Sequence, residues 1–249
     1  GGLILDPQNR TTISFVQNSP DGERDFSFFR NPGADQKITP EEVRMDIVRQ
    51  CRVFHFGTLS LTDEPSRSAT MAAVKAAKES GARISFDPNI RPPLWHSMEE
   101  AKRQTSWGCG QCDVLKIAED ELRFLSGEKS IKAGVSFLRG HFPKIALILV
   151  TKGKEGAEAF YGGLHVSVPT FRRVKSVDTT GAGDTFCGSC LGYLLDNEIE
   201  SLTEEKLLEM LKFANAASSL ITTRKGALRS MPSLQEIHQL MREEKVGEE

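Results

Sequence analysis

Short apolar segments alternate with helix-forming segments through most of this 249-residue sequence. A strand that leads through a helix into the next strand makes a right-handed crossover, and the two strands then lie parallel. The alternation therefore predicts an α/β fold, with a mainly parallel central sheet flanked by helices. The expected strands are residues 53–56, 84–86, 114–117 and 145–150. The expected helices are residues 66–80, 119–125, 131–142 and 204–222, and another that begins at Ser97. An antiparallel hairpin is expected from residues 157–161 and 164–168.

The N-terminal residues have the pattern of a β-hairpin. Residues 11–30 are β-branched in their first part and contain three phenylalanines in their last part, with turn-forming residues at 18–22. The strand period of two puts Phe28 and Arg30 on one face. This pattern fits an ordinary edge hairpin and also a cover over a polar ligand. The expected parts of the chain are a small β lid segment, residues 1–36, and an α/β core, residues 37–249.

A further helix is expected after this hairpin. Thr39-Pro-Glu-Glu is typical of a helix start, because it combines a capping residue, a proline at the first helical position and a glutamate at the third. Val43, Ile47 and Cys51 would then form a core-facing stripe.

The composition excludes several classes of function. The sequence has 32 basic and 34 acidic residues and a net charge of -2, so it has no electrostatic footprint for nucleic acid. Its longest apolar run, Ile145 to Val150, is far shorter than the roughly 20 residues that span a membrane. The first residues show neither a basic leader nor an apolar signal core, and the five cysteines are an odd number. We therefore expect a cytoplasmic protein that binds neither nucleic acid nor membranes.

Two Cys-x-x-Cys pairs, at 109–112 and 187–190, suggest a four-sulfur zinc site. The second pair, however, lies in an expected helix beside Gly188 and Gly192. Small residues at helical spacing usually mean close packing. We favour the packing interpretation.

The richest stretch for chemistry is Asp-Thr-Thr-Gly-Ala-Gly-Asp-Thr-Phe, residues 178–186. Gly181 and Gly183 allow a tight turn in which backbone amides at a helix start converge on an anion. Asp184 places a carboxylate, ionised at neutral pH, in that same turn. A phosphate-binding turn beside a base indicates phosphoryl transfer to an alcohol. The alternative is that the glycines only permit close packing of helix and sheet.

Other polar segments follow the expected strands. Asp87 and Arg91 follow one, residues 116–121 another, and residues 151–156 a third. Open parallel sheets bind ligands beyond the carboxyl ends of their strands, so phosphate-compatible groups should gather at that edge. The sequence contains no Gly-x-x-x-x-Gly-Lys-Ser/Thr stretch, which excludes a P-loop, and no strand followed by a dinucleotide fingerprint.

The glycine-rich stretch resembles the C-terminal signature of the ribokinase-like (PfkB) carbohydrate kinases. Residues 28–35, 85–95, 213–217 and 223–227 resemble the fructokinase branch of that family and the neighbouring 2-keto-3-deoxygluconate kinases. The resemblance implies a ribokinase-like fold with a β lid. Family members carry a first strand that ends in a sugar-binding aspartate, which the ten residues before the hairpin do not supply. The resemblance thus implies that the N-terminal part of the family fold is missing from this sequence.

The resemblance also assigns roles. Asp184 would be the base that takes the sugar hydroxyl proton, with the anion hole formed by Gly181, Ala182 and Gly183. Arg91 would steady the substrate or the transferring phosphoryl group, and Phe28 and Arg30 would close on the sugar. The nucleotide-binding residues would be Lys116, Thr151, Lys152, Gly153, Gly156, Asn215 and Gly226. The metal-associated residues would be Glu121 for Mg²⁺ and Asp178 with Thr180 for a monovalent cation, K⁺. Where the family commonly has Asn-x-x-Glu, this sequence has Ala118-Glu-Asp-Glu121.

The function implied by the resemblance is an ATP-dependent sugar kinase that converts fructose to fructose 6-phosphate. One alternative is a 2-keto-3-deoxygluconate kinase, because Arg30 occurs in both branches. An alternative of another class is a kinase-like binding module without catalysis. Lid hairpins of the family often pair between subunits, so a homodimer through the lid is a further expectation.

Overall fold

The computed structural model describes residues 2–18, 24–171 and 173–245. It divides into two compact units, Gly1–Gln111 and Cys112–Glu249, and the expected lid segment lies in the first. Of the turn expected at 18–22, residues 19–22 lie outside the described residues.

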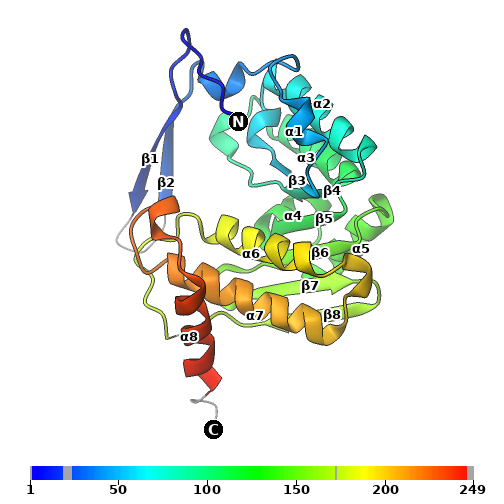
Figure 1. The fold of residues 1–249 in the computed structure, drawn as a ribbon, viewed down its shortest axis with the longest axis vertical. Coiled ribbons are helices and arrows are strands. Elements are labelled where there is room, and N and C mark those ends of the chain that lie inside the picture. The colour runs from blue at the N-terminus through cyan, green and yellow to red at the C-terminus, as the bar shows by residue number, and fades with distance from the viewer. Residues whose placement is uncertain (1, 19–23, 172, 246–249) are drawn as a thin grey trace. The chain divides into compact units, whose positions relative to one another are not determined.

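The first unit contains an antiparallel ribbon and a parallel pair of strands. Strands β1 (Ile13–Asn18) and β2 (Arg24–Phe29) form the two-stranded ribbon visible in Figure 1, with Ile13 opposite Phe29. Strands β3 (Val53–Gly57) and β4 (Arg83–Asp87) pair in parallel. The hairpin and both strands predicted for this part of the chain are therefore confirmed.

Two helices follow these strands. Helix α2 (Ser66–Glu79) buries a face of small alanines, at 69, 73, 76 and 77, which lets it pack closely. Helix α3 (Met98–Gln111) begins after Ser97, whose Oγ accepts a hydrogen bond from the Glu100 amide at 3.1 Å. The rings of Phe56 and Phe86 lie 4.7 Å apart, and Trp107 of α3 lies 5.8 Å from Phe56. The described part of this unit also contains the short helices η1 (Ala34–Gln36), η2 (Leu59–Leu61) and η3 (Pro92–Leu94).

The helix predicted from Thr39 is wrong in its extent. The structure has only the four-residue helix α1 (Met45–Val48). The capping interaction does form, since Glu42 accepts a hydrogen bond from the Thr39 amide at 2.8 Å. Ile47, however, is 44% exposed, and no residue of α1 is buried. Local capping alone does not stabilise a helix that lacks a buried face.

The second unit contains strands of both directions. Strands β5 (Val114–Ala118) and β6 (Leu147–Thr151) pair in parallel, whereas β6, β7 (Ala157–Tyr161) and β8 (Leu164–Val168) are antiparallel. Strands β5 to β8 follow one another in chain order in the mixed sheet of this unit. The predicted β7–β8 hairpin has the predicted bounds. Two helices lie between β5 and β6: α4 (Glu119–Ser126) and α5 (Ile131–His141).

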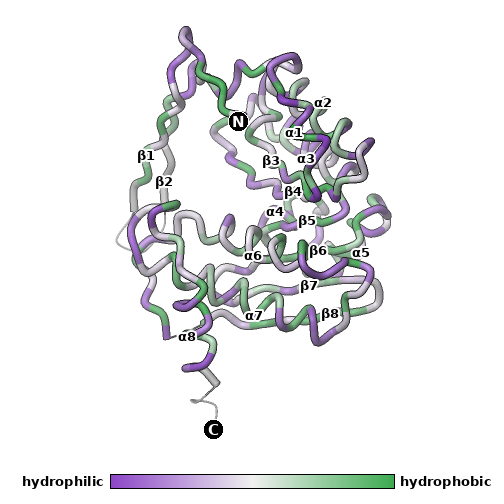
Figure 2. The backbone as a smooth tube through the Cα atoms, viewed as in Figure 1, coloured by the Kyte–Doolittle hydropathy of each residue, from purple (hydrophilic) through white to green (hydrophobic). Residues whose placement is uncertain are grey.

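In the described residues, three long helices follow β8. These are α6 (Ala182–Asp196), α7 (Glu204–Ile221) and α8 (Leu234–Lys245). The short helix η5 (Ile199–Ser201) lies between α6 and α7, and η6 (Leu228–Ser230) lies between α7 and α8. Another short helix, η4 (Gly153–Glu155), precedes β7. Helices α6 and α7 lie side by side in Figure 1. Figure 2 shows polar and hydrophobic residues alternating along α7. Its apolar side, which includes Leu207, Leu211 and Ala214, joins β6, β7 and β8 in one hydrophobic cluster.

One cysteine of α6, Cys190, belongs to this hydrophobic cluster. Cys187 and Cys190 are buried, and burial raises the pKa of Cys190 well above its ordinary value, with Cys187 adding to the effect. Within the described part of the chain, no three His, Cys, Asp or Glu side chains are grouped in a way that could hold a metal ion. Cys190 lies in the core cluster that also contains residues of α7.

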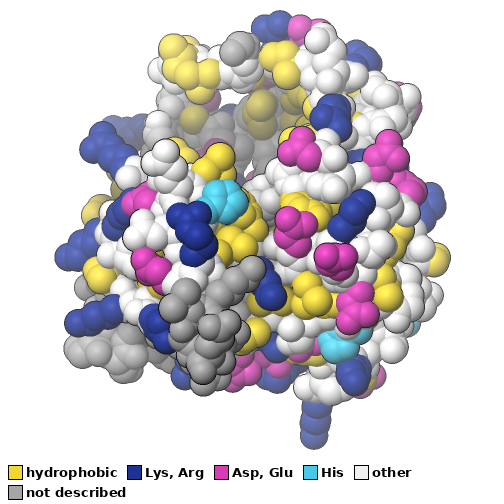
Figure 3. All heavy atoms as spheres, turned by 60° about the horizontal axis from the view of Figure 1, so that its bottom comes forward, with side chains coloured by type: hydrophobic (Ala, Val, Ile, Leu, Met, Phe, Trp, Pro, Cys, Tyr) yellow, Lys and Arg dark blue, Asp and Glu magenta, His cyan; other side chains and the backbone are white. Residues whose placement is uncertain are grey.

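The surface carries both signs of charge. On the face shown in Figure 3, Lys and Arg side chains are interspersed with Asp and Glu. None of the helices in the described residues has the length and apolar character needed to cross a membrane.

Replacing Gly108 of α3 by alanine is expected to destabilise the protein by about 1–3 kcal/mol, the usual cost of overpacking. The added Cβ atom would lie 2.4 Å from the Phe86 ring, which is fully buried and cannot move aside. The control is Gly110→Ala on the same helix, where an added Cβ meets nothing within 4 Å. Urea unfolding should show a lower midpoint for Gly108→Ala alone, and equal midpoints would contradict the packing argument.

Candidate active site

The glycine-rich turn opens helix α6, as the sequence predicts, but of the two glycines expected in the turn, Gly183 lies inside the helix. Gly181 caps the helix in the left-handed region, at φ 78°, which an L side chain rarely adopts. The Ala182 amide donates to the Thr179 carbonyl at 3.2 Å. Asp184 lies exposed in the first turn of the helix. The first turn of α6 therefore combines the positive end of the helix dipole with an accessible carboxylate.

A lysine reaches the same turn from strand β5. Lys116 is buried, and its Nζ would lie 3.3 Å from a Cβ atom built on Gly183. The ammonium group of Lys116 therefore lies close to the first turn of α6, at Gly183. Gly183 is the residue that precedes Asp184. The absence of a side chain at position 183 leaves room for this approach. A phosphate at the start of α6 would meet both helix amides and a cation.

Asp178 fixes the turn that precedes α6. Its Oδ1 accepts hydrogen bonds from the Thr180 amide at 2.9 Å and the Thr180 hydroxyl at 2.7 Å, and its Oδ2 accepts from the Gly226 amide at 3.1 Å. The Val177 and Asp178 amides both donate to the Thr222 carbonyl, at 2.7 and 3.0 Å. One carboxylate thus joins the glycine-rich turn to the segment that follows α7.

The predicted nucleotide segment begins where β6 ends. Thr151 is the last residue of β6, and the Lys152 amide donates to the Gly156 carbonyl at 2.8 Å to close the next turn. Gly156 has φ 97°, and a Cβ atom there would lie 2.1 Å from the Val168 carbonyl oxygen. Only glycine fits at this position. Gly153, the other predicted glycine, also has a positive φ of 56°.

The ammonium of Lys152 lies in an ion pair behind this turn. Lys152 Nζ and His165 Nε2 each lie 2.8 Å from the carboxylate of Glu158. His165 also stacks on Phe160, with 4.3 Å between ring centroids. The structure therefore uses Lys152 to anchor the turn.

Two residues predicted to bind the nucleotide or the metal ion make hydrogen bonds within the protein. Asn215, buried in α7, donates from Nδ2 to the carbonyls of Val168 and Pro169, at 3.0 and 3.1 Å. Glu121 accepts a hydrogen bond from the Ala118 amide at 3.0 Å. Asn215 thereby holds the chain that leaves β8, and Glu121 closes the start of α4.

The predicted site residues of the first unit lie around the strand ends. Arg30 follows β2, and its guanidinium bonds to Asp35, Thr62 and the Leu59 carbonyl. Phe28 lies in β2 opposite Ser14. Arg91 follows β4 and donates to the Ile90 carbonyl at 3.2 Å.

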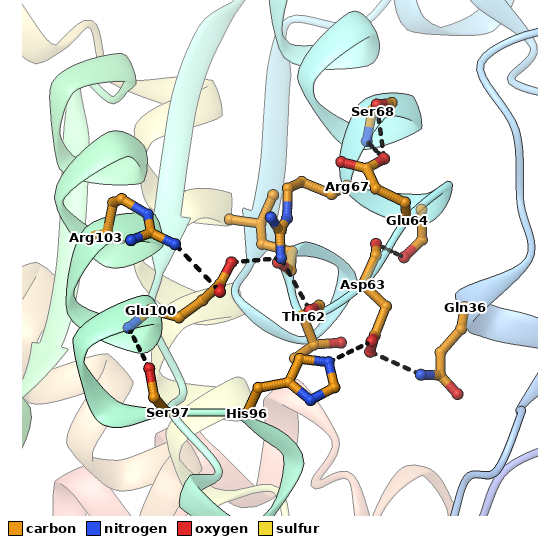
Figure 4. Close-up of polar contacts among 12 residues, drawn as sticks. Gln36, Thr62, Asp63, Glu64, Arg67, Ser68, His96, Ser97, Glu100 and Arg103 are labelled. Atoms are coloured by element: carbon orange, nitrogen blue, oxygen red, sulfur yellow. Dashed lines mark hydrogen bonds and ion pairs between the residues drawn. The ribbon is translucent and has the colours of Figure 1, made fainter.

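A polar network fixes the loop that Arg30 contacts (Figure 4). Arg67 donates to the carbonyls of Leu61 and Thr62, at 2.8 and 2.9 Å, and lies 2.8 Å from Glu100. Asp63 accepts from Gln36 at 2.7 Å and lies 3.0 Å from His96. Burial acts to raise the pKa of Asp63, but these hydrogen bonds outweigh it and lower the pKa below its ordinary value.

The sequence did not indicate two of these partners. The Thr222 carbonyl acts through the backbone, which side-chain identity does not reveal. Asp35 lies five residues after Arg30, inside a stretch singled out for its resemblance. A charge pair at that spacing has no periodic signature outside a helix, although the two opposite charges were visible.

Comparison with known proteins shows similarity along nearly the whole chain. The model of the pfkB family carbohydrate kinases matches residues 2–234, which confirms the predicted resemblance. The chain is 43% identical over 232 residues to the probable fructokinase-2 of Arabidopsis thaliana, covering 93% of this chain and 70% of that protein. It is 42% identical over 241 residues to fructokinase-1 of Zea mays, covering 97% of this chain and 74% of that protein.

Solved structures show the same similarity. A fructokinase of Xylella fastidiosa with bound ATP superposes with a TM-score of 0.86 at 30% identity, over 96% of this chain and 76% of that one. A fructokinase of Vibrio cholerae O395 with fructose, ADP and calcium ion bound gives a TM-score of 0.85 at 33% identity, over 96% and 76%. The likeness thus includes both units of the chain.

Replacing Glu158 by glutamine is expected to lower the free energy of unfolding at pH 7 by about 1 kcal/mol, because charged hydrogen bonds are lost. Burial acts to raise the pKa of Glu158, but the hydrogen bonds of Lys152 and His165 outweigh it, so the folded pKa lies below the ordinary 4.5. The ordinary pKa of 4.5 applies to the unfolded state. The ionised carboxylate therefore stabilises the fold at pH values above 4.5, and this stabilisation is lost as the pH falls through the lower pKa of the folded state.

Urea unfolding of Glu158→Gln and wild type from pH 7 downward measures this effect. The deficit of the variant should shrink once the pH falls below about 4.5. The control is Glu155→Gln, an exposed carboxylate on the neighbouring turn. A deficit that stays constant across the pH series would argue against the charge-based interpretation.

Proposed function

The chain belongs to the pfkB family of carbohydrate kinases, and from this premise we propose that it phosphorylates fructose to fructose 6-phosphate with ATP. The observation that carries the proposal is the 43% identity to a probable fructokinase over 93% of the chain. The solved fructokinases to which the chain is similar hold ATP in one case and fructose with ADP in another. We further propose that the enzyme works in the cytoplasm. Cysteine thiols stay reduced there, and an odd number of cysteines cannot all pair in disulfides within one chain.

Asp184 is proposed as the general base. The sugar hydroxyl oxygen attacks the γ-phosphorus of ATP, its proton passes to the Asp184 carboxylate, and the bond to the β–γ bridging oxygen breaks so that ADP leaves. Such transfers have a loose transition state, in which positioning and charge stabilisation matter more than a strong base. The exposed position of Asp184 in the first turn of α6 suits this role.

The turn of Gly181, Ala182 and Gly183 is proposed as the anion hole. Negative charge that develops on the phosphoryl oxygens is met by backbone amides at a helix start and by the dipole of α6. Lys116, whose Nζ lies near Gly183, adds a fixed positive charge at the same place. The remaining nucleotide contacts are proposed for Thr151, Lys152, Gly153, Gly156, Asn215 and Gly226.

Cations are proposed at two places. Glu121 would help to bind Mg²⁺, which would neutralise charge on the ATP phosphates. A monovalent cation, K⁺, would be held by the loop of Asp178 and Thr180. Both places offer oxygen atoms, which these hard cations prefer. Because Asp178 already bonds to Thr180 and Gly226, its carboxylate orders the loop that would receive the ion.

Residues of the first unit are proposed to handle the sugar. Phe28 and Arg30 would contact it, and Arg91 would steady the transferring phosphoryl group. The alternative of a binding module without catalysis is less well supported, because Asp184 and the anion-binding turn are both present.

Replacing Asp184 by asparagine is expected to lower turnover of fructose by about 10²–10⁴, the range for a lost general base. The amide keeps the size of the side chain but does not accept the proton. A coupled assay of ADP release, with fructose, glucose, ribose and 2-keto-3-deoxygluconate offered in turn, measures the effect on the full-length enzyme.

The matched control is Asp196→Asn, an exposed aspartate at the other end of α6, which should keep wild-type turnover. Full activity of Asp184→Asn would refute its role as base. A wild-type enzyme that turns over another of these sugars and not fructose would refute the substrate.

We also propose that two copies of the chain pair through the lid ribbon. Ile13, Phe15 and Phe29 lie on one face of β1 and β2 and are 54%, 57% and 68% exposed. The rings of Phe15 and Phe29 are in edge contact, with centroids 5.6 Å apart. A two-stranded ribbon with an apolar face is marginal by itself and gains stability when that face is covered.

The double variant Phe15→Ser/Phe29→Ser is expected to sediment as a monomer at concentrations where the wild type is a dimer. The control is Leu3→Ser, which removes an apolar side chain that is 85% exposed and lies outside the ribbon. A wild-type monomer, or a dimer that survives the double change, would count against pairing through the lid.

A further inference from the structure

The positive charge of Arg30 is balanced by the carboxylate of Asp35, which lies in the same unit. Its Nε and Nη2 both lie 2.7 Å from Oδ2 of Asp35, and its side chain is only 5% exposed. Asp35 is itself held, because its Oδ1 accepts a hydrogen bond from the Thr12 hydroxyl at 2.5 Å. The guanidinium and the carboxylate therefore form a fixed pair.

Two further N–H groups of Arg30 also make hydrogen bonds. Nη1 donates to the Thr62 hydroxyl at 2.9 Å, and Nη2 donates to the Leu59 carbonyl at 2.8 Å. A guanidinium offers five N–H donors in a rigid plane, so these bonds set the orientation of the whole group. Turning Arg30 toward a new anion would break several of them together.

The surroundings keep the pair in place. The loop that carries Thr62 is fixed by Arg67, and the neighbouring Asp63 is fixed by Gln36 and His96 (Figure 4). Gln36 also accepts a hydrogen bond from the Gly33 amide at 2.9 Å, within the turn that carries Asp35. The segment that follows β2 and the loop after β3 are thus tied by two separate polar contacts.

We infer that Asp35 is a specificity-determining residue, which makes Arg30 select a neutral sugar over a sugar acid. The inference rests on the proposed function and on the proposed contact between Arg30 and the sugar. An arginine whose charge is balanced by a fixed carboxylate offers a substrate carboxylate no net attraction, and Asp35 repels it. Without Asp35 the buried guanidinium would lack its counter-ion and would attract an anion.

The test compares Asp35→Asn with wild type in the full-length enzyme. Asparagine keeps the shape of the side chain and an acceptor oxygen, but it removes the negative charge. The ratio of kcat/KM for 2-keto-3-deoxygluconate to kcat/KM for fructose should rise on the order of 10-fold or more, mainly through a lower KM for the acid. The control is Asp46→Asn, which breaks an exposed ion pair with Arg44 in the same unit and should leave the ratio unchanged.

A second variant separates charge from shape. In Arg30→Gln/Asp35→Asn neither charge remains, so the preference gained for the acid should disappear. Calorimetric titration of wild type and Asp35→Asn with 2-keto-3-deoxygluconate provides a readout without turnover, and the variant should bind the acid at least ~10-fold more tightly.

Three outcomes would overturn the inference: an unchanged ratio and an unchanged affinity in Asp35→Asn, a preference that persists in the double variant, or a wild type that binds the acid as tightly as fructose. A wild type that binds fructose and rejects the acid but has no turnover would contradict the proposed kinase activity alone. The affinity comparison would then still decide the role of Asp35.

Discussion

The carboxylate of Asp178 is the interaction on which the start of α6 depends. It receives the Thr180 amide and hydroxyl on one oxygen and the Gly226 amide on the other. These bonds hold the glycine-rich turn against the segment after α7. Because the first amides of a helix have no partner within the helix, their direction is set by the turn that precedes them. Asp178 therefore determines where those amides point, and the chemistry proposed for the turn follows from that direction.

The first unit uses charged side chains in the same way. Arg67 bonds to the carbonyls of Leu61 and Thr62, and Arg30 bonds to that of Leu59. Backbone groups in a loop lie outside the ladders of a sheet, so each needs a partner from a side chain or from water. A guanidinium meets several carbonyls at once and leaves little freedom for the loop. Both units thus build firm loops at strand and helix ends from single ionised groups.

The sequence predicted those features whose signals are local. Alternating and helical patterns located the β7–β8 hairpin and α7. Because glycine fits a tight turn, the glycine-rich stretch placed Gly181 at the start of α6. The helix expected at Thr39 failed because capping is local, whereas the burial that stabilises a helix depends on distant packing. The bond between Asp178 and Gly226 joins residues 48 positions apart. No pattern in a single sequence reports such a pair.

The firmness of these loops matters because of the reaction. In phosphoryl transfer the protein makes few covalent changes, and its contribution is to hold donors, cations and the acceptor hydroxyl in place. A donor that must reorganise during the reaction loses part of its stabilising effect. A turn fixed by Asp178, with Lys116 beside it, would present its positive charge before the phosphate of the proposed reaction arrives. The same logic applies to the proposed contact between Arg30 and the sugar: a charge balanced by Asp35 before the substrate arrives would contribute shape and hydrogen bonding, and it would contribute no net attraction for an acid.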